Sequence, residues 1–263
     1  MPTDQPTQGC SSRHSSRYFV TGTDTDAGKT LISSALLAYG QQKGLSTFGL
    51  KPVAAGCELN DNQQWINEDA LLHQTLSFPP HDYALHNPVA LQAAIAPHIA
   101  AEQEARPLQL SELASQCLHS LNSSQAELQI IEGAGGWLVP LNNNNSMADL
   151  AVELSKDGPM EVILVVGLKL GCINHALLTL ESIQQRGLKL AGWVANSLSP
   201  DMEVEADNLN YLTNQFEQQG IARLGHVPFI ADLADLRQPA TESEQSLAIK
   251  ISAARSASRY LQI

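Results

Sequence analysis

Six short apolar runs recur along the chain, each rich in β-branched or aromatic residues. They occupy residues 18–22, 47–53, 128–134, 161–168, 190–196 and 222–229. Several of these runs, such as EVILVVGL at 161–168, have no polar alternation. A strand that is apolar on both faces is typical of a buried parallel sheet. The pattern therefore predicts six buried strands.

Helical patterns lie between these runs, at residues 29–43, 111–121, 174–186 and 203–219. Alternating strands and helices predict an α/β fold with a doubly wound, mostly parallel sheet and helices on both faces. The polar stretches 58–69 and 140–147 are short and flanked by such patterns, which indicates loops rather than linkers. We predict a single domain over 18–263, preceded by a disordered N-terminal extension over 1–17.

Composition narrows the classes of partner. A chain of 263 residues that is 43% hydrophobic can bury one large core. Its net charge of −12 leaves no basic face for nucleic acid or an anionic membrane. Residues 1–17 lack the apolar centre of a signal peptide, and no run approaches the length of a membrane span. The four cysteines, Cys10, Cys57, Cys117 and Cys172, form no CxxC pair, which favours a reduced cytoplasmic protein.

The segment GTDTDAGKT at 22–30 directly follows the first predicted strand. It nearly matches the phosphate-binding pattern G-x-x-x-x-G-K-[ST], with Thr23 in place of the first glycine. Gly28, Lys29 and Thr30 open a predicted helix, whose N-terminus attracts anions. The sequence therefore predicts a nucleotide site and a P-loop NTPase-like fold.

Two acidic residues in this loop, Asp24 and Asp26, would repel a phosphate group. We expect them to face Mg²⁺ or a cationic group of a substrate. The alternative to nucleotide binding is an ordinary strand-to-helix turn capped by Thr25 or Asp26. The strand, loop and helix context makes this alternative less favoured.

Polar side chains at the ends of other predicted strands are further candidates. Glu132 ends the third strand and is followed by glycines, which allow close approach of the backbone to a ligand. Lys51 ends the second strand and suits a phosphate or carboxylate clamp. For Asp69 a metal ligand and a helix N-terminal acid are both open. For Asn196 a base-reading role and an ordinary turn residue are both open.

The histidines show no HExxH or paired spacing, so the sequence predicts no zinc site. Cys172 lies in KLGCINH with no base placed beside it by the sequence. We interpret it as a buried thiol rather than a nucleophile.

Several blocks together closely resemble the dethiobiotin synthetase family: YFVTGTDTDAGKT, GLKPVAAG, NEDALL, IIEGAGGWLVPL, VILVVGLKLGCINHALLTLESI and LAGWVAN. The resemblance runs from about Tyr18 to at least Pro228. The EGAGGW and GLKLGCINHALLT blocks are much more specific than a P-loop. Threonine in place of the first loop glycine is usual in the wider group of related enzymes, so Thr23 fits the resemblance.

The resemblance implies a cytoplasmic ATP- and Mg²⁺-dependent ligase of biotin biosynthesis. Such an enzyme carboxylates 7,8-diaminopelargonic acid with CO2 and closes the ureido ring of dethiobiotin. The implied intermediates are a carbamate and a carbamic-phosphoric anhydride. ATP is a co-substrate, and no nucleic acid or membrane is a partner.

The resemblance also implies roles for residues. Catalytic roles fall to Thr25, Lys29 and Lys51, and the metal ligands would be Thr30, Asp69 and Glu132. Nucleotide contacts would come from Asp26, Ala27, Gly28, Lys29, Thr30, Asn196, Pro228, Phe229, Ile230 and Asp235. Substrate contacts would come from Thr25, Lys51, Ala55, Gly135, Gly167, Lys169, Leu170, Gly171, Cys172, Ile173 and Asn174.

Two further features follow from the resemblance. The family commonly has serine where this chain has Ala55, which puts one hydroxyl contact in doubt. A homodimer with shared active sites is implied, in which residues 167–174 reach the substrate of the neighbouring subunit.

Two rival functions share parts of this pattern. A partitioning-type ATPase switch normally carries a lysine early in the loop, where this chain has Thr23, Asp24 and Thr25. A glutamine-dependent cobyrinate-type amide synthetase needs a second, amidotransferase domain, for which 263 residues are too few. Both are therefore less favoured than the synthetase.

Overall fold

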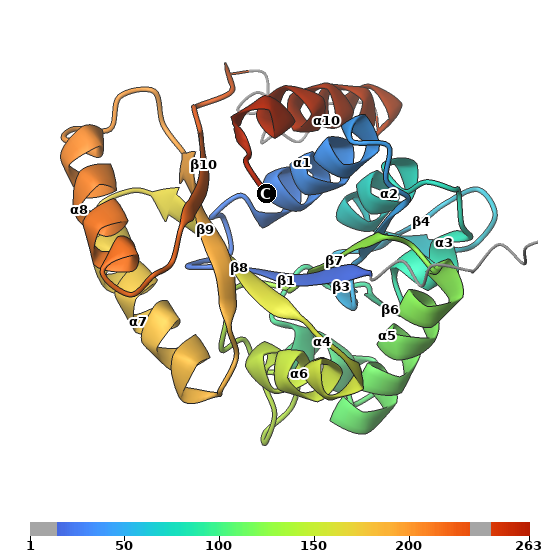
Figure 1. Ribbon diagram of the computed structural model, residues 1–263. Coiled ribbons are helices and arrows are strands. Elements are labelled where there is room, and N and C mark those ends of the chain that lie inside the picture. The colour runs from blue at the N-terminus through green and yellow to red at the C-terminus, as the bar shows by residue number, and fades with distance from the viewer. Residues whose placement is uncertain (1–14, 232–242) are drawn as a thin grey trace, which may run out of the picture.

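The computed structural model describes residues 15–231 and 243–263. Its centre is a six-stranded sheet in the order β10-β9-β8-β1-β7-β2, and every pair in it is parallel (Figure 1). The strands are β1 (Ser16–Gly22), β2 (Thr47–Leu50), β7 (Leu128–Glu132), β8 (Glu161–Leu168), β9 (Leu190–Ser197) and β10 (Arg223–Val227). The prediction of six buried parallel strands is confirmed.

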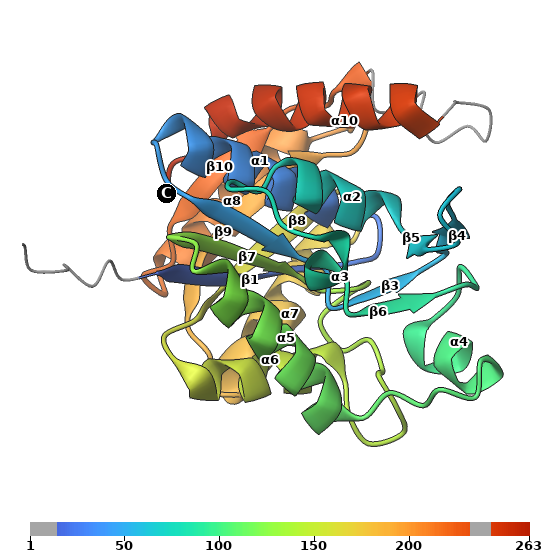
Figure 2. The ribbon, with the colours of Figure 1, turned by 90° about the vertical axis from the view of Figure 1, so that its right-hand side faces the viewer.

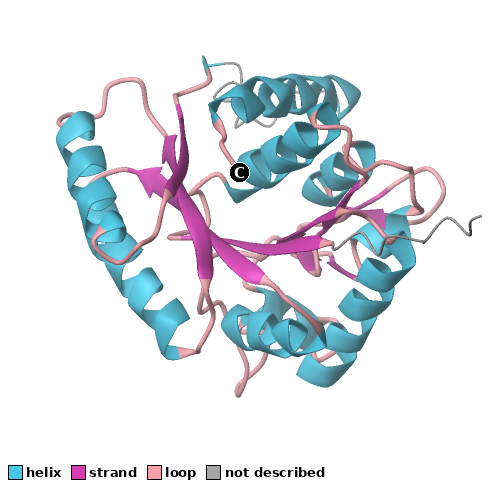
Figure 3. Ribbon diagram, viewed as in Figure 1, coloured by secondary structure: helices cyan, strands magenta, loops and turns pink. Residues whose placement is uncertain are grey.

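Helices cover both faces of this sheet, as Figures 1 and 3 show. One face carries α1 (Lys29–Gln42), α2 (Glu68–Thr75) and α10 (Ser243–Ala257). The other carries α5 (Leu110–Ser124), α6 (Met147–Leu154), α7 (Cys172–Gln185) and α8 (Glu205–Glu217). Two short helices, α3 (Tyr83–His86) and α4 (Pro97–Gln103), lie in the segment between β2 and α5. The four predicted helices are confirmed as α1, α5, α7 and α8, with slightly shifted ends.

The segment after β2 differs from its prediction. The expected strand over 47–53 ends at Leu50, and β3 (Val53–Ala55) pairs instead with β6 (Val89–Leu91) in a separate two-stranded sheet. The expected loop over 58–69 contains a small antiparallel pair, β4 (Glu58–Leu59) with β5 (Trp65–Ile66), and the start of α2. These strands are too short to produce a periodic pattern.

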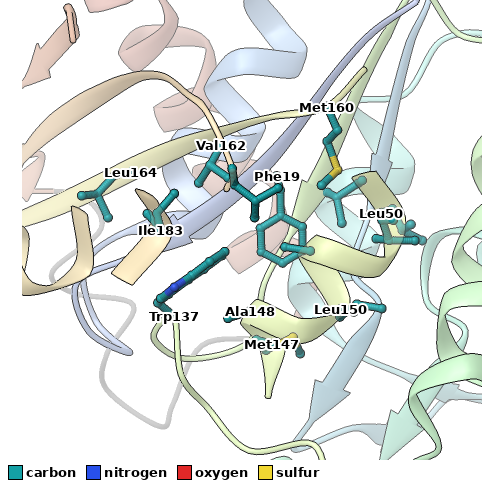
Figure 4. Packing of buried hydrophobic residues seen from close by; sticks show 14 of the residues in the cluster. Phe19, Leu50, Trp137, Met147, Ala148, Leu150, Met160, Val162, Leu164 and Ile183 are labelled. Atoms are coloured by element: carbon teal, nitrogen blue, oxygen red, sulfur yellow. The ribbon is translucent and has the colours of Figure 1, made fainter. Parts of the chain in front are cut away.

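The two neighbouring residues Phe19 and Val20 show how β1 builds both core layers. Side chains alternate along a strand, so Phe19 belongs to the core layer on the side of α5 to α8, and Val20 belongs to the layer on the side of α1 and α2. Phe19 meets Trp137 edge to face, with ring centroids 6.1 Å apart (Figure 4). The tryptophan of the EGAGGW block is therefore part of the core beneath the strand ends.

The N-terminal boundary needs a small correction. β1 begins at Ser16, and Arg17 is buried, with its Nε donating to Gln129 Oε1 at 2.9 Å. The predicted extension over 1–17 is therefore two residues too long, and residues 1–14 lie outside the described part of the chain. The single domain stays a prediction. Among the described residues, no helix has the length and apolarity needed to cross a bilayer.

Candidate active site

The loops that follow β1, β2 and β7 meet at one edge of the sheet. β7 lies between β1 and β2 (Figure 2). Its register pairs Glu132 with Val20 and Ile131 with Leu50. The next strand in sequence, β8, then lies on the other side of β1. The loop after β1 is thus at the point where the strand order reverses, which is where doubly wound sheets bind ligands.

The loop between β1 and α1 is held in shape by the ends of β8 and β9. Gly28 has φ 94° and is the N-cap of α1, without any side-chain cap. Asn196 Nδ2 donates to Ala27 O at 3.0 Å, and a Cβ on Gly28 would lie only 2.1 Å from that amide nitrogen. The alternative of a turn capped by Thr25 or Asp26 is therefore wrong. The uncapped first turn suits an anion.

Lys29 is folded back onto this loop and is almost fully buried. Its Nζ donates to Asp24 O and Thr25 O, both at 3.0 Å. Burial lowers the pKa of Lys29 to about 8, and the nearby charge of Lys51 acts in the same direction. The ammonium thus lies in the loop that would surround a phosphate.

Glu132 is the centre of a buried charge cluster. Its Oε1 accepts from Lys51 Nζ at 2.5 Å and from Thr30 Oγ1 at 2.8 Å, and its Oε2 lies 2.8 Å from His73 Nε2. Burial acts to raise the pKa of Glu132, but Lys51 and His73 outweigh it, so the pKa lies well below its usual range. Glu132 is therefore ionised.

Lys51 joins two carboxylates and has a fixed main chain. Its Nζ also donates to Asp69 Oδ2 at 3.0 Å. Burial acts to lower the pKa of Lys51, but Asp69 and Glu132 outweigh it, so the pKa lies above its ordinary value. The amide of Lys51 donates to His86 O at 2.7 Å, and Asn87 Nδ2 donates to Lys51 O at 2.8 Å.

The oxygen atoms around Lys51 Nζ fit a magnesium ion. Thr30 supplies a hydroxyl, and Asp69 and Glu132 supply carboxylates, which are the hard donors that Mg²⁺ prefers. In residues 15–231 and 243–263, no group of three or more His, Cys, Asp and Glu could hold a metal. The three donors Thr30, Asp69 and Glu132 would fill only part of the octahedral shell of Mg²⁺, as is usual for this ion beside phosphates.

A pocket of about 490 Å³ opens beside this cluster. It brings together eight residues singled out from the sequence: Thr25, Lys29, Thr30, Lys51, Ala55, Asp69, Glu132 and Gly135. The sequence did not indicate the other lining residues, which include Asn67, Ala94, Ile95, Pro97 and Val139. The mixture of charged and apolar lining suits a ligand that has both kinds of group.

The acidic residue Asp24 has a partner within the chain. Its carboxylate forms an ion pair with Lys169, which follows β8, and this contact lowers the pKa of Asp24. The sequence predicted a metal or a cationic substrate group as the partner of Asp24, and the cation that the structure places beside it is Lys169 of the same chain. Asp26 is exposed at the tip of the loop.

The remaining predicted residues do not line the pocket. In the segment 167–174, Gly167 packs against Ala27, and Leu170 is 98% exposed. Gly171 has φ 92° and is the N-cap of α7, whose residues Ile173 and Asn174 lie near its start. Cys172 is buried, as predicted for a structural thiol. Pro228, Phe229 and Ile230 follow β10 beside Asn196, and Asp235 lies outside the described residues.

Sequence reasoning missed His73. It is buried on α2, four residues after Asp69, and so both side chains lie on the face of α2 that is turned to the cluster. That spacing was the available signal. The N-cap of α2 was also missed: Asn67 Oδ1 accepts from the amide of Asp69 at 3.0 Å and fixes the start of the helix.

The loop, the two lysines and the buried carboxylate on a parallel sheet define a P-loop nucleotide-binding protein of the α/β class. A family model described as an AAA domain matches residues 16–237. A ParA family ATPase from Chlorobium tepidum has a similar structure, with a TM-score of 0.52, 13% identity, and coverage of 92% of this chain and 93% of that chain. That likeness shows the fold alone.

Sequence relatives are much closer. The ATP-dependent dethiobiotin synthetase BioD of Cellvibrio japonicus is 54% identical over 198 residues, which are 75% of this chain and 84% of that protein. The protein of the same name from Chromohalobacter salexigens is 50% identical over 199 residues, 75% of this chain and 81% of its own. This chain belongs to the ATP-dependent dethiobiotin synthetase family.

Proposed function

We propose that the protein forms dethiobiotin from 7,8-diaminopelargonic acid, CO2 and ATP, as the step of biotin biosynthesis that its family name describes. The observation that carries this proposal is the meeting of Lys29, Thr30, Lys51, Asp69 and Glu132 around one pocket. Two cationic side chains beside a P-loop suit a reaction in which two anionic groups must be held together.

The chemistry divides into three balanced steps. One amine of the substrate adds to CO2 and loses a proton, which gives a carbamate. A carbamate oxygen attacks the γ-phosphorus of ATP, ADP leaves, and a carbamic-phosphoric anhydride forms. The second amine attacks the carbonyl carbon, the bond to the phosphate oxygen breaks, and a proton is lost. This last step is intramolecular and gains from proximity.

The lysines would act on different parts of this anionic assembly. Lys29, in the P-loop, is placed for the phosphates, and Lys51, after β2, is placed for the carbamate and the transferred phosphoryl group. Thr25 lines the same pocket and would contact the substrate. Asp26 to Thr30 would surround the phosphates, with Asn196 and Pro228 to Ile230 on the side of the adenine.

Magnesium would be held by Thr30, Asp69 and Glu132, and it would offset negative charge during phosphoryl transfer. Lys51 Nζ now lies between the two carboxylates, so in the loaded site the ammonium would turn toward the substrate. Glu132→Gln should raise the Mg²⁺ concentration needed for half-maximal rate. An unchanged requirement would exclude Glu132 as a ligand.

Residues 167–174 would complete the site of a second subunit. Support comes from their absence from the lining of the pocket, and from the exposure of Leu170 and Asn174. Mixing inactive Lys51→Ala and Asn174→Ala subunits tests this. About half the dimers would be mixed, each with one intact site, so about a quarter of wild-type activity should return. No recovery would contradict shared sites.

The overall proposal is tested by phosphate release. The synthetase should release phosphate rapidly only when ATP, diaminopelargonate and bicarbonate are all present, with dethiobiotin formed in equal amount. Phosphate release from ATP alone at the same rate would instead support a switch ATPase.

A further inference from the structure

His73 contacts the cluster through the carboxylate oxygen of Glu132 that Thr30 of the P-loop does not bind. The ring is fully buried on α2, and its Nε2 lies 2.8 Å from Glu132 Oε2. Thr30 and Lys51 both bind the other oxygen, Oε1. The two carboxylate oxygens of Glu132 thus have separate partners.

We infer that His73 is a positioning residue: it holds Oε2 of Glu132, so that Oε1 stays directed at Thr30 and the metal. This inference rests on the proposed function, because it concerns the magnesium site described there. It extends the site by a residue that would touch neither metal nor substrate.

The other partners of Glu132 would have competing tasks in the loaded site. In the loaded site the Thr30 hydroxyl and Oε1 would both face the metal, and Lys51 would turn to the substrate. The bond from His73 goes to the oxygen that the metal does not need. The contact between His73 and Glu132 can therefore persist both with and without bound metal. It would leave the fully buried carboxylate of Glu132 with one hydrogen-bond donor when Thr30 and Lys51 turn to other partners.

The position of His73 is fixed by its contacts with β2 and α2. A Cβ at position 49 would lie 2.7 Å from the Cβ of His73, so Gly49 on β2 leaves the space that His73 occupies. Ser77 Oγ donates to His73 O at 2.7 Å and accepts from the amide of Gly49 at 3.0 Å. Strand and helix are thereby tied together at the histidine.

The imidazole of His73 directs one hydrogen bond to Glu132. A carboxylate only accepts, so Nε2 must carry the hydrogen. Nδ1 is buried and has no hydrogen-bond partner in the described structure. The polar function of the ring is therefore directed to Glu132 alone. If His73 served only for packing, an apolar side chain of similar size would be more favourable, because it would not bury an unpaired nitrogen.

The test measures metal binding without turnover. The probe is Mn²⁺ in the presence of β,γ-methylene-ATP, with free Mn²⁺ followed by electron paramagnetic resonance. His73→Leu should raise the dissociation constant for Mn²⁺ roughly tenfold or more. His73→Gln, whose amide can donate from nearly the position of Nε2, should restore most of the affinity. In kinetics, the Mg²⁺ requirement should rise more than kcat falls.

His86→Leu is the matched control. His86 is also a fully buried histidine, and its ring bonds Gly49 O but does not contact Glu132. Its replacement should lower stability and leave Mn²⁺ affinity unchanged. If His73→Leu does not fold, the comparison of His73→Gln with the shorter His73→Asn decides, because only glutamine can reach Oε2.

Two results would overturn the inference. Unchanged Mn²⁺ affinity in folded His73→Leu, or in both the Gln and Asn variants, would leave His73 as a packing residue, while the proposed magnesium site would stand. Failure of the wild-type protein to bind Mn²⁺ with the nucleotide analogue would overturn the magnesium site, and this inference with it.

Discussion

The ammonium of Lys51 lies 2.5 Å from Oε1 of Glu132, with the lysine side chain 7% exposed and the glutamate fully buried. Each charge stabilises the other, because either one alone would be energetically unfavourable when buried at this position. The contact joins the ends of β2 and β7 directly beside the P-loop.

Lys51→Ala should lower kcat by roughly a hundredfold or more, if the ammonium contributes about 3 kcal/mol of transition-state stabilisation. Steady-state kinetics with all three substrates measures this. Lys156→Ala, which removes an exposed lysine, is the control and should have no effect. Near-normal turnover of the Lys51 variant would remove this residue from the chemistry.

Lys51→Met should also change how the free energy of unfolding depends on pH. The lowered pKa of Glu132 means that its native contribution is present above the ordinary value of 4.5 and is lost as pH falls. Without the cation, ionising this buried carboxyl becomes unfavourable. We expect a loss of about 3 kcal/mol in the free energy of unfolding at pH 8, and a smaller loss at pH 5.

Urea unfolding of wild type and Lys51→Met at both pH values measures that difference. The double variant Lys51→Met/Glu132→Gln has no buried charge at these two positions. Its loss of unfolding free energy relative to wild type should therefore be the same at both pH values. If Lys51→Met loses the same unfolding free energy at pH 5 and at pH 8, the ionisation of Glu132 is not the source of the loss.

His86 should make the protein less stable in mild acid. Burial lowers the pKa of His86 from 6.5 to about 4. The unfolded chain therefore takes up the proton first as pH falls, and the contribution present above pH 6.5 is lost toward pH 4. The loss reaches about 3 kcal/mol, from 1.36 kcal/mol per pKa unit.

His86→Leu lacks the titrating group, so its unfolding free energy should fall less than that of wild type between pH 7 and pH 4.5. Urea unfolding at several pH values checks the two slopes. Parallel slopes would show that His86 is not protonated more readily in the unfolded chain.

Gly28→Ala should disturb the P-loop, because the new Cβ would lie 2.1 Å from Asn196 Nδ2 and the backbone has φ 94°. We expect a loss of about 1 to 3 kcal/mol in stability and at least a tenfold weaker binding of ATP. Calorimetric titration and thermal unfolding measure the two effects.

Gly44→Ala is the matched control for this variant. Gly44 also has a positive φ, of 76°, but a Cβ there meets no atom within 4 Å. The Gly44→Ala variant should have backbone strain but unchanged ATP affinity. Equal effects of both variants on ATP binding would contradict a specific role for the contact of Gly28 with Asn196.

The sequence was most informative where one local pattern decides the structure. Runs such as 161–168 have no polar face, so a buried strand was the natural interpretation. Lys51 and Glu132 were found because each ends such a run, and the carboxyl ends of parallel strands share one edge. The eight predicted residues in the pocket follow from this rule and from the resemblance.

Contacts between distant segments could not be predicted in this way. The partners Asp24 and Lys169 are 145 positions apart, and nothing local to either residue indicates the other. The position of His73 depends on how α2 docks on β2, where Gly49 leaves space for the histidine. Asp69 was ambiguous between two roles, and it has features of both: it lies in the first turn of α2 and pairs with Lys51.

The main chain of Lys51 is held on both sides, by His86 O and by the amide of Asn87. If the ammonium leaves the carboxylates when the site is loaded, the exchange must therefore be a change of side-chain rotamers and not a movement of the loop. One cation would then replace another at Asp69 and Glu132. The two acids would then have a cation beside them both before and after magnesium binds, with the lysine ammonium in the place of the metal beforehand.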